Sequence, residues 1–250
     1  MRISIKNLSV KLGGRDVLKN LSAEVPNGSF SVLLGQNGAG KTTLVSTLSG
    51  IISYHGEILL GDKPLSSLAA KDRARMLSIV PQLPARASIT VEDLLAFGRL
   101  PYHTLGERLN EGDHGRMEQA MELFELNALR SSTLDRISGG ELRRAYLAMA
   151  FVQDTPVIVL DEPTAHLDAQ NQARILEILK TLNEKHGKTV LAVMHRIADA
   201  VQYADRLLLM RDGSVIQQGS VTEILAGRYI EETFGVERYT GEIWGVRQSN

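Results

Sequence analysis

The feature that most constrains this chain is a glycine-rich loop between an apolar run and a helical pattern. Residues 35 to 42 read GQNGAGKT, which fits the pattern G-x-x-x-x-G-K-[ST] of phosphate-binding loops. The loop follows the apolar run Phe30 to Leu34 and precedes a helical face formed by Leu44 and Leu48. Strand, glycine loop and helix in this order are the context that the pattern requires. We therefore expect a phosphate-binding α/β domain, and not an ordinary tight turn with an exposed lysine.

The residue types of this loop suit the binding of a nucleotide. Glycines let the backbone curl so that several N–H groups point at phosphate oxygens, and the dipole of the following helix adds positive potential. Lys41 is expected to neutralise the β and γ phosphates, and the hydroxyl of Thr42 to bind Mg²⁺. The predicted nucleotide contacts in the loop are Gly35, Gln36, Asn37, Gly38, Ala39, Gly40, Lys41, Thr42 and Thr43.

Two kinds of strand pattern alternate with helical periodicity along the rest of the chain. Polar and apolar residues alternate over 3 to 10, and residues 57 to 62 read as another strand running into a turn; together they predict a small antiparallel sheet. Nearly continuous apolar runs at 30–34, 157–160, 190–194 and 207–210 are typical of parallel strands covered on both faces. The sequence Asp212-Gly213 predicts a hairpin turn between two late strands. The alternation of strands and helices predicts an α/β fold.

The stretch between Gln82 and Pro156 contains no evident strand pattern, and we interpret it as a helical insertion. Thr90 with Asp93 forms a capping-box pattern, so a helix should begin there. Residues 99 to 113, which include proline and glycines, are expected to form an exposed connector. The predicted division is a core from 1–82 and 156–250 and a helical subdomain from 83–155.

Composition excludes several classes of protein. The 250 residues carry 28 Lys and Arg against 29 Asp and Glu, so a wide basic surface for nucleic acid is not indicated. The absence of cysteine excludes disulfides and thiolate metal sites. The start of the chain lacks the apolar centre of a signal peptide, and no run approaches the ~20 apolar residues of a membrane span. We expect the chain to act on a membrane only from outside the bilayer.

Two carboxylates follow the apolar run at 157–160. Asp161 and Glu162 are placed at the carboxyl end of a strand, where open α/β sheets bind their ligands. Neighbouring strand residues point to opposite faces, so the two acids should have different roles. We expect Asp161 to hold Mg²⁺ through water and Glu162 to polarise an attacking water. The alternative is a pair of solvated acids at the end of a strand.

Two further candidates depend on their position. His195 follows the run at 190–194 and should reach the same sheet edge, although a single histidine is more often structural. Gln82 follows a short strand pattern at 78–80, and an amide in a loop is usually only solvated. Both become candidates because of the phosphate-binding loop.

The segment Ser138-Gly139-Gly140-Glu141 begins a second glycine-rich helix. The helical face that follows, from Leu142 to Met149, places Ser138 at the helix start. An outward-facing helix N-terminus can bind an anion. Ser138 and Glu141 also form a capping box, which would satisfy the helix's own N–H groups. The two interpretations can hold at different times.

These motifs, in this order and spacing, resemble those of the ATP-binding-cassette (ABC) ATPases over nearly the whole chain. The resemblance implies a P-loop NTPase core with a mixed, mostly parallel sheet, an antiparallel β-subdomain and an inserted α-helical subdomain. It implies that ATP and Mg²⁺ are bound, with Thr42, Gln82 and Asp161 at the metal. It further implies that Glu162 is the catalytic base, that His195 contacts the γ phosphate, and that Asp168 couples two sites.

The same resemblance explains the second glycine-rich segment. In this family the segment at Ser138 caps the γ phosphate of ATP held by a second copy, so two chains sandwich two nucleotides. The implied assembly is a homodimer or a pair of different cassettes.

Three positions depart from the family pattern. Glu141 stands where glutamine is more usual, and Arg196 follows His195 where aspartate is common. The residue expected to stack on adenine is Leu12, with Val17 behind it, instead of an aromatic side chain. Because base stacking contributes about 1 to 3 kcal/mol in comparable sites, ATP affinity is expected to be modest unless another group covers the base.

The region Thr90 to Tyr102 is similar to cassettes that serve iron-siderophore, haem and cobalamin uptake. This implies an importer subunit at the cytoplasmic face of the membrane, with separate permease chains, a groove near Gln82 for a cytoplasmic permease helix, and an external substrate-binding protein. The cargo itself is not encoded in this chain. The alternatives are a cassette protein without a permease, as in iron–sulfur assembly, and a nucleotide-binding regulatory subunit without turnover.

Overall fold

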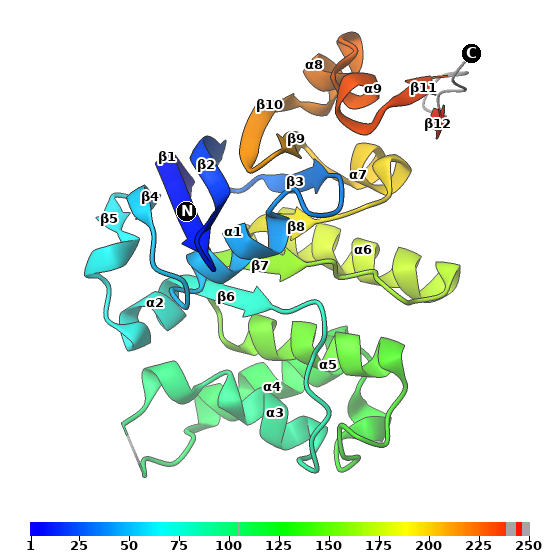
Figure 1. Cartoon of the computed structure of the whole chain (residues 1–250). Helices are drawn as coiled ribbons and strands as arrows, with labels where there is room; N and C mark the ends of the chain where they lie inside the picture. Colours follow the sequence, from blue (N-terminus) through cyan, green and yellow to red (C-terminus); the bar gives the residue numbers. More distant parts are fainter. Residues whose placement is uncertain (105, 239–243, 247–250) are drawn as a thin grey trace. The chain divides into compact units, whose positions relative to one another are not determined.

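The computed structural model describes residues 1–104, 106–238 and 244–246 (Figure 1). The chain forms two compact units. The first combines Met1–Ser67 with Thr189–Asn250, and the second is Leu68–Lys188. This division follows compactness and differs from the expected subdomain boundaries after 82 and after 155, which stay a prediction.

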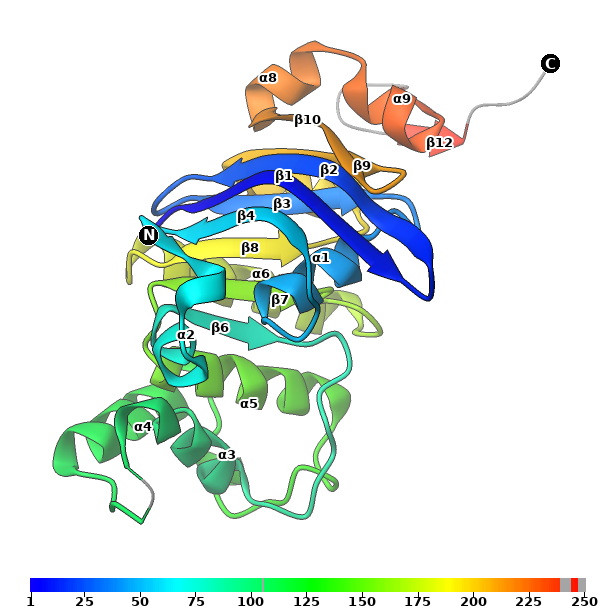
Figure 2. The ribbon, with the colours of Figure 1, turned by 60° about the vertical axis from the view of Figure 1, so that its left-hand side comes forward.

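The first unit contains the expected antiparallel sheet, with strand order β2-β1-β4-β5 (Figure 2). In β1 the alternating side chains of Ile3, Ile5, Leu8 and Val10 are buried, as the sequence pattern predicted. Ile3 pairs with Val25 on one side of β1 and with Leu60 on the other. The strands are β1 (Ile3–Leu12), β2 (Arg15–Val25), β4 (His55–Leu60) and β5 (Lys63–Pro64).

The first unit also contains the strand that leads into the glycine loop. This strand, β3, lies between β8 and β9 and is parallel to both, and all of its residues are buried. β10 pairs antiparallel with β9 across the turn at Asp212 and Gly213, whose φ angles are 50° and 86°. The predicted parallel strands and hairpin are thus confirmed. The strands are β3 (Phe30–Gly35), β8 (Thr189–Val193), β9 (Arg206–Arg211) and β10 (Ser214–Ser220).

Helices complete the first unit. The residues after Gly227 are too few for a separate domain and predict a terminal helix with a short arm; α9 forms there, and the arm lies partly outside the described residues. The remaining elements are η1 (Leu65–Ser67), α1 (Lys41–Leu48), α7 (Ile197–Tyr203), α8 (Val221–Ala226), α9 (Tyr229–Phe234), β11 (Val236–Arg238) and β12 (Trp244–Val246).

The second unit pairs β6 with β7 in parallel and adds helices. The capping box of Thr90 and Asp93 is present at the start of α3, as predicted. Between β6 and β7 the described residues contain no named strand, which confirms the helical character of the stretch. The elements are α2 (Ala70–Met76), β6 (Leu77–Val80), α3 (Val91–Phe97), η2 (Leu100–Tyr102), α4 (Glu111–Leu123), η3 (Asn127–Leu129), α5 (Gly139–Val152), β7 (Val157–Asp161) and α6 (Ala169–Glu184).

The expectation that residues 99 to 113 form an exposed connector was wrong at both ends. Arg99 and Asp113 are buried, and the Arg99 Nε lies 2.7 Å from the Asp113 Oδ1. The other Asp113 oxygen lies 2.7 Å from the His103 Nε2, and the Arg99 guanidinium lies 4.1 Å from the centre of the Tyr102 ring. A buried charge needs this kind of pairing. Proline and glycine indicated a loop correctly, but they say nothing about the ion pair that fixes its ends.

None of the helices among the described residues is long and apolar enough to cross a membrane.

Candidate functional site

The phosphate-binding loop is shaped by two close backbone approaches. A Cβ atom at Gly35 would lie 2.4 Å from the carbonyl oxygen of Met210 in β9. At Gly40 the φ angle is 101°, and a Cβ atom would lie 2.8 Å from a methyl carbon of Leu18. Both positions therefore require glycine. Gly35 leaves no room for a side chain, and Gly40 leaves little room and has a positive φ angle. The loop curls between them into the first turn of α1.

Lys41 is held against the loop that precedes it. It is 5% exposed, and its ammonium donates to the carbonyl oxygens of Gly35 at 2.8 Å and Gln36 at 2.9 Å. These bonds fix a positive charge at the start of α1, where the helix dipole is also positive. The next residue, Thr42, is exposed, and Thr43 is half-buried. The predicted phosphate-binding residues are thus brought together within one unit.

The expected adenine contacts are aliphatic. Leu12, the last residue of β1, is 42% exposed. Val17 is half-buried, and its carbonyl oxygen would lie 3.2 Å from a Cβ atom at Gly40. Val17 thus contacts the loop through its backbone, and Leu12 offers an apolar but non-aromatic surface.

His195 follows β8 and is exposed. Arg196 immediately precedes α7, and its Nε lies 3.4 Å from the carboxylate of Asp199. The unusual arginine is therefore part of a local ion pair on its own helix.

The second unit brings Gln82 and Glu162 together. The Gln82 Nε2 donates to the Glu162 Oε2 at 2.6 Å. Arg143 of α5 donates to the backbone carbonyl oxygens of Pro81 at 2.7 Å and Gln82 at 2.6 Å. Burial lowers the pKa of Arg143, whereas Asp161 and Glu162 act in the opposite direction. The sequence analysis missed Arg143, because side-chain bonds to distant backbone leave no trace in a sequence pattern.

The end of β7 has a strained backbone. Asp161 is 3% exposed, and Glu162 is half-buried. Glu162 and His166 have φ angles of 49° and 61°, in a region that costs energy for residues other than glycine. Strain of this kind persists where the surrounding structure enforces it, as at functional sites. The amide of Ala165 donates to the Glu162 carbonyl oxygen at 3.1 Å and closes the turn.

The capping box predicted for the second glycine-rich segment is present. The Glu141 Oε2 accepts from the amide of Ser138 at 2.8 Å, and the Ser138 Oγ accepts from the amide of Glu141 at 3.3 Å. Hydrogen bonds from Ser138 lower the pKa of Glu141. The carboxylate is thus turned back onto its own helix. Ser138 and Gly139 are exposed at the helix start, and a Cβ atom at Gly139 would meet no described atom within 4 Å.

Asp168 caps a neighbouring helix. Its carboxylate accepts from the amide of Asn171 at 2.8 Å at the start of α6, and this bond lowers the pKa of Asp168. A Cβ atom at Gly140 would lie 2.8 Å from the Asn171 Oδ1. The starts of α5 and α6 therefore touch through Asn171, which the sequence analysis did not identify. A side chain at Gly140 would force the amide of Asn171 to shift.

The predicted metal ligands supply oxygen donors that suit Mg²⁺. No group of three or more His, Cys, Asp or Glu side chains that could hold a metal occurs within the described part of the chain. Mg²⁺ usually keeps several waters and takes few protein ligands. The hydroxyl of Thr42 in the first unit, and the carboxylate of Asp161 and the amide oxygen of Gln82 in the second, are donors of the kind that Mg²⁺ prefers; their role as its ligands stays a prediction. Because the amide nitrogen of Gln82 faces Glu162, its oxygen is the atom available to a cation.

Comparisons with known proteins agree with this geometry. A family model described as "ABC transporter" matches residues 18–165. The ferric enterobactin transport ATP-binding protein FepC of Escherichia coli (strain K12) is 35% identical over 94% of this chain and 88% of that protein. The iron(3+)-hydroxamate import ATP-binding protein FhuC of Bacillus subtilis (strain 168) is 32% identical over the same shares.

Solved structures show the same fold. A dimeric structure of the ATP-binding cassette MJ0796 in a post-hydrolysis state, bound to ADP and Pi, aligns with a TM-score of 0.76 at 26% identity, covering 88% of this chain and 98% of that one. The structure of cbiO1 from Clostridium perfringens aligns with a TM-score of 0.79 at 27% identity, covering 92% of each chain.

Together, the fold and the site define a P-loop ATPase of the cassette type. The chain belongs to the ABC transporter family. The predicted fold class, family and ATPase activity are thereby confirmed.

Changing Glu141 to Gln tests the charge of the capping box. Because the folded state lowers the pKa of Glu141 from 4.5, its charge stabilises the fold fully above that value and loses this effect as pH falls through the lowered pKa. Glu141→Gln should therefore lower the free energy of unfolding by about 0.5 kcal/mol at pH 7, and by less at pH 3. Urea unfolding across this range measures the difference. An equal loss at both pH values would contradict a role for the charge.

Proposed function

We propose that this chain is the ATP-hydrolysing subunit of an importer that takes up either an iron complex, with siderophore as the first candidate and haem as the second, or cobalamin. The observation that supports it most directly is the carboxylate of Glu162 held by Gln82 at 2.6 Å in the second unit, in a chain whose first unit contains a complete phosphate-binding loop. The relatives named for siderophore transport support the cargo class.

The loop residues bind the phosphates of ATP. The backbone amides from Gln36 to Gly40 surround them, Lys41 neutralises the β and γ groups, and Thr42 and Thr43 complete the first turn. Adenine lies against Leu12 and Val17. Since an aliphatic surface lacks the stacking contribution of an aromatic ring, the phosphates supply most of the affinity.

Thr42, Gln82 and Asp161 would each supply an oxygen ligand to the Mg²⁺ that accompanies ATP. The cation supplies charge neutralisation for the phosphates. Gln82 would then have two roles, because its amide nitrogen donates to the carboxylate of Glu162 and its oxygen would be a ligand of the metal.

Glu162 acts as the general base for an attacking water, and His195 contacts the γ phosphate. The strained turn at Glu162 fixes the direction of its carboxylate. Arg143 holds the backbone of Gln82, so it positions the amide that in turn positions Glu162. The chemistry required is an in-line attack by water with the developing charge neutralised by Lys41.

A second copy completes the site. The exposed start of α5 presents Ser138, Gly139 and the N–H groups beyond them to the γ phosphate on the partner, and Asp168 lies in the loop that couples the two sites. Glu141 stands in place of the usual glutamine, but its carboxylate points back at Ser138, which reduces repulsion of the phosphate. The dimeric cassette structure supports this assembly. The partner is an identical copy or a different cassette.

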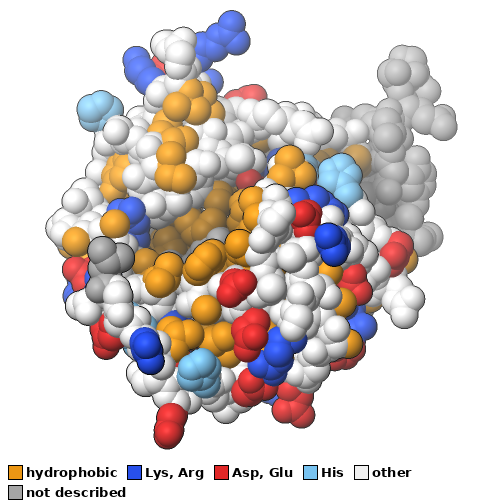
Figure 3. Space-filling view, turned by 90° about the horizontal axis from the view of Figure 1, so that it is seen from below, with side chains coloured by type: hydrophobic (Ala, Val, Ile, Leu, Met, Phe, Trp, Pro, Cys, Tyr) orange, Lys and Arg blue, Asp and Glu red, His pale blue; other side chains and the backbone are white. Residues whose placement is uncertain are grey.

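A pocket beside Gln82 suits a cytoplasmic helix of the permease. It has a volume of about 210 Å³, and its lining includes the apolar residues Leu83, Pro84, Leu142, Ala165 and Leu167. Leu83, Phe97 and Leu100 are the large apolar side chains exposed in this unit, as far as it is described. Figure 3 shows hydrophobic side chains gathered on the face seen from below.

Binding of ATP draws the two cassettes together, and hydrolysis separates them. The helical segment moves with this change, and it transmits the motion to the permease helix that is bound in the pocket beside Gln82. An external protein delivers the cargo on the other side of the membrane, and this chain works at the cytoplasmic face.

Replacing Glu162 by Gln tests the catalytic base. The amide cannot accept a proton from water, so phosphate release should fall by at least about a hundredfold while ATP still binds. Glu184→Gln, at the exposed end of α6, is the control and should hydrolyse ATP at the normal rate. Undiminished phosphate release by Glu162→Gln would show that another group is the base.

Replacing Leu83 by Glu tests the permease pocket. Leu83 is 77% exposed, so the fold should tolerate the charge, whereas an apolar helix in the pocket should not. We expect loss of permease co-purification and of iron-complex uptake. Ile216→Glu introduces the same charge at an exposed apolar position of β10 and should preserve both. Normal uptake with Leu83→Glu would place the permease elsewhere.

A further inference from the structure

One contact of the phosphate-binding loop has no part in the function derived above. The Gln36 Nε2 donates to the backbone carbonyl oxygen of Thr233 at 3.1 Å. Thr233 lies on α9, close to 200 residues further along the chain. The second residue of the loop is therefore tied to the C-terminal helix.

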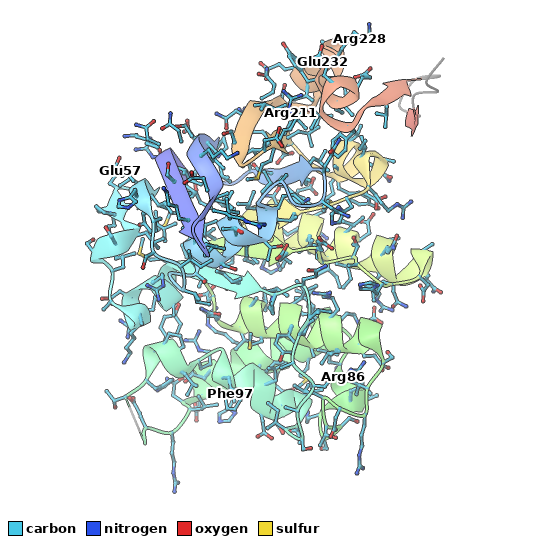
Figure 4. The ribbon with its side chains drawn as sticks, in the orientation of Figure 1. Glu57, Arg86, Phe97, Arg211, Arg228 and Glu232 are labelled. Carbon is cyan, nitrogen blue, oxygen red and sulfur yellow. The ribbon has the colours of Figure 1, made fainter. Side chains whose placement is uncertain are left out.

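The contact provides a hydrogen-bond donor for a backbone carbonyl oxygen at the C-terminal end of α9. The last carbonyl oxygens of an α-helix have no partner within the helix. At the end of α9 the Thr233 oxygen accepts from Gln36, and the Glu232 oxygen lies 3.5 Å from the Arg211 Nη1 at the end of β9 (Figure 4). The amide of Gly235, at a φ of 65°, donates to the Glu231 oxygen at 2.8 Å. Gln36 thus forms part of the C-terminal cap of α9.

The helix offers Gln36 a firm anchor. Ile230 and Thr233 are at most 1% exposed, so the inner face of α9 is packed into the first unit. The Thr233 hydroxyl donates to the Tyr229 oxygen at 2.5 Å. A side chain bonded to this helix is held by the core and not by a fraying end.

The anchored residue also orients the loop. The backbone carbonyl oxygen of Gln36 accepts from the Lys41 ammonium at 2.9 Å and from the amide of Ala39 at 3.2 Å. Holding the Gln36 side chain therefore restricts the peptide that positions the lysine and closes the turn. A loop held in its binding shape loses less conformational entropy when a ligand binds.

We propose that Gln36 is a positioning residue that ties the phosphate-binding loop to α9, so that nucleotide binding and the order of α9 are thermodynamically linked. The inference goes beyond the proposed function and rests on it in one respect, namely that ATP binds at this loop. Linkage is reciprocal: detaching α9 weakens ATP binding, and ATP stabilises α9.

A double-mutant cycle tests the link. Gln36→Leu keeps a side chain of similar size but removes the Nε2 donor of the hydrogen bond to Thr233. Ile230→Ala weakens the packing of α9 and leaves the loop sequence unchanged. Each change should raise the ATP dissociation constant, measured with EDTA to prevent turnover, by about fivefold. Because both break the same link, the double variant should also lose about fivefold and not about twenty-five-fold. Gln218→Leu, which removes a bond to the Glu24 amide elsewhere in the unit, should leave the constant unchanged.

Hydrogen exchange supplies the reciprocal measurement. In the wild-type protein ATP should slow the exchange of amides 230 to 235, and in Gln36→Leu it should not. Additive losses in the cycle, or equal protection of α9 in both proteins, would overturn the link. Failure of the wild-type protein to bind ATP at all would instead refute the proposed function, so the two failures are distinguishable.

Discussion

The site depends on one constraint: phosphate must be met by backbone N–H groups, which requires the loop backbone to lie against the body of the protein. Gly35 permits contact with the carbonyl oxygen of Met210, and Gly40 permits contact with Leu18. A side chain at either position would push the loop away from β9 or β2. Lys41 is then folded onto the same loop by two carbonyl oxygens, so the charge and the amides share one rigid frame.

The elements that could be predicted from the sequence are those with a periodic residue pattern or a short local motif. The alternation in β1, the apolar runs of β3, β7, β8 and β9, and the capping boxes at Thr90 and Ser138 are local patterns with a direct physical cause. The connector at 99 to 113 was misjudged because its burial depends on an ion pair between Arg99 and Asp113. Such a pair depends on tertiary packing, which cannot be predicted from a short stretch of sequence.

The same distinction applies within the site. The residues with motif spacing were identified from the sequence, and their catalytic and binding roles stay predictions. Arg143, Asn171 and the contact between Gln36 and Thr233 were not identified, because each joins a side chain to a backbone or helix start far along the chain. At Ser138 the capping box is confirmed and the start of α5 is exposed, whereas the contact with a partner's phosphate stays a prediction.

The central claim is that two chains sandwich ATP, each presenting Ser138 to the loop of the other. Since the chain has no cysteine, it can be tested with two single-cysteine proteins of different size, one Ser138→Cys and one Asn37→Cys, both with Glu162→Gln. A short bifunctional maleimide should join the two proteins when ATP and Mg²⁺ are present and leave them separate without nucleotide. Absence of the mixed product with ATP bound, or equal amounts with and without it, would contradict the account.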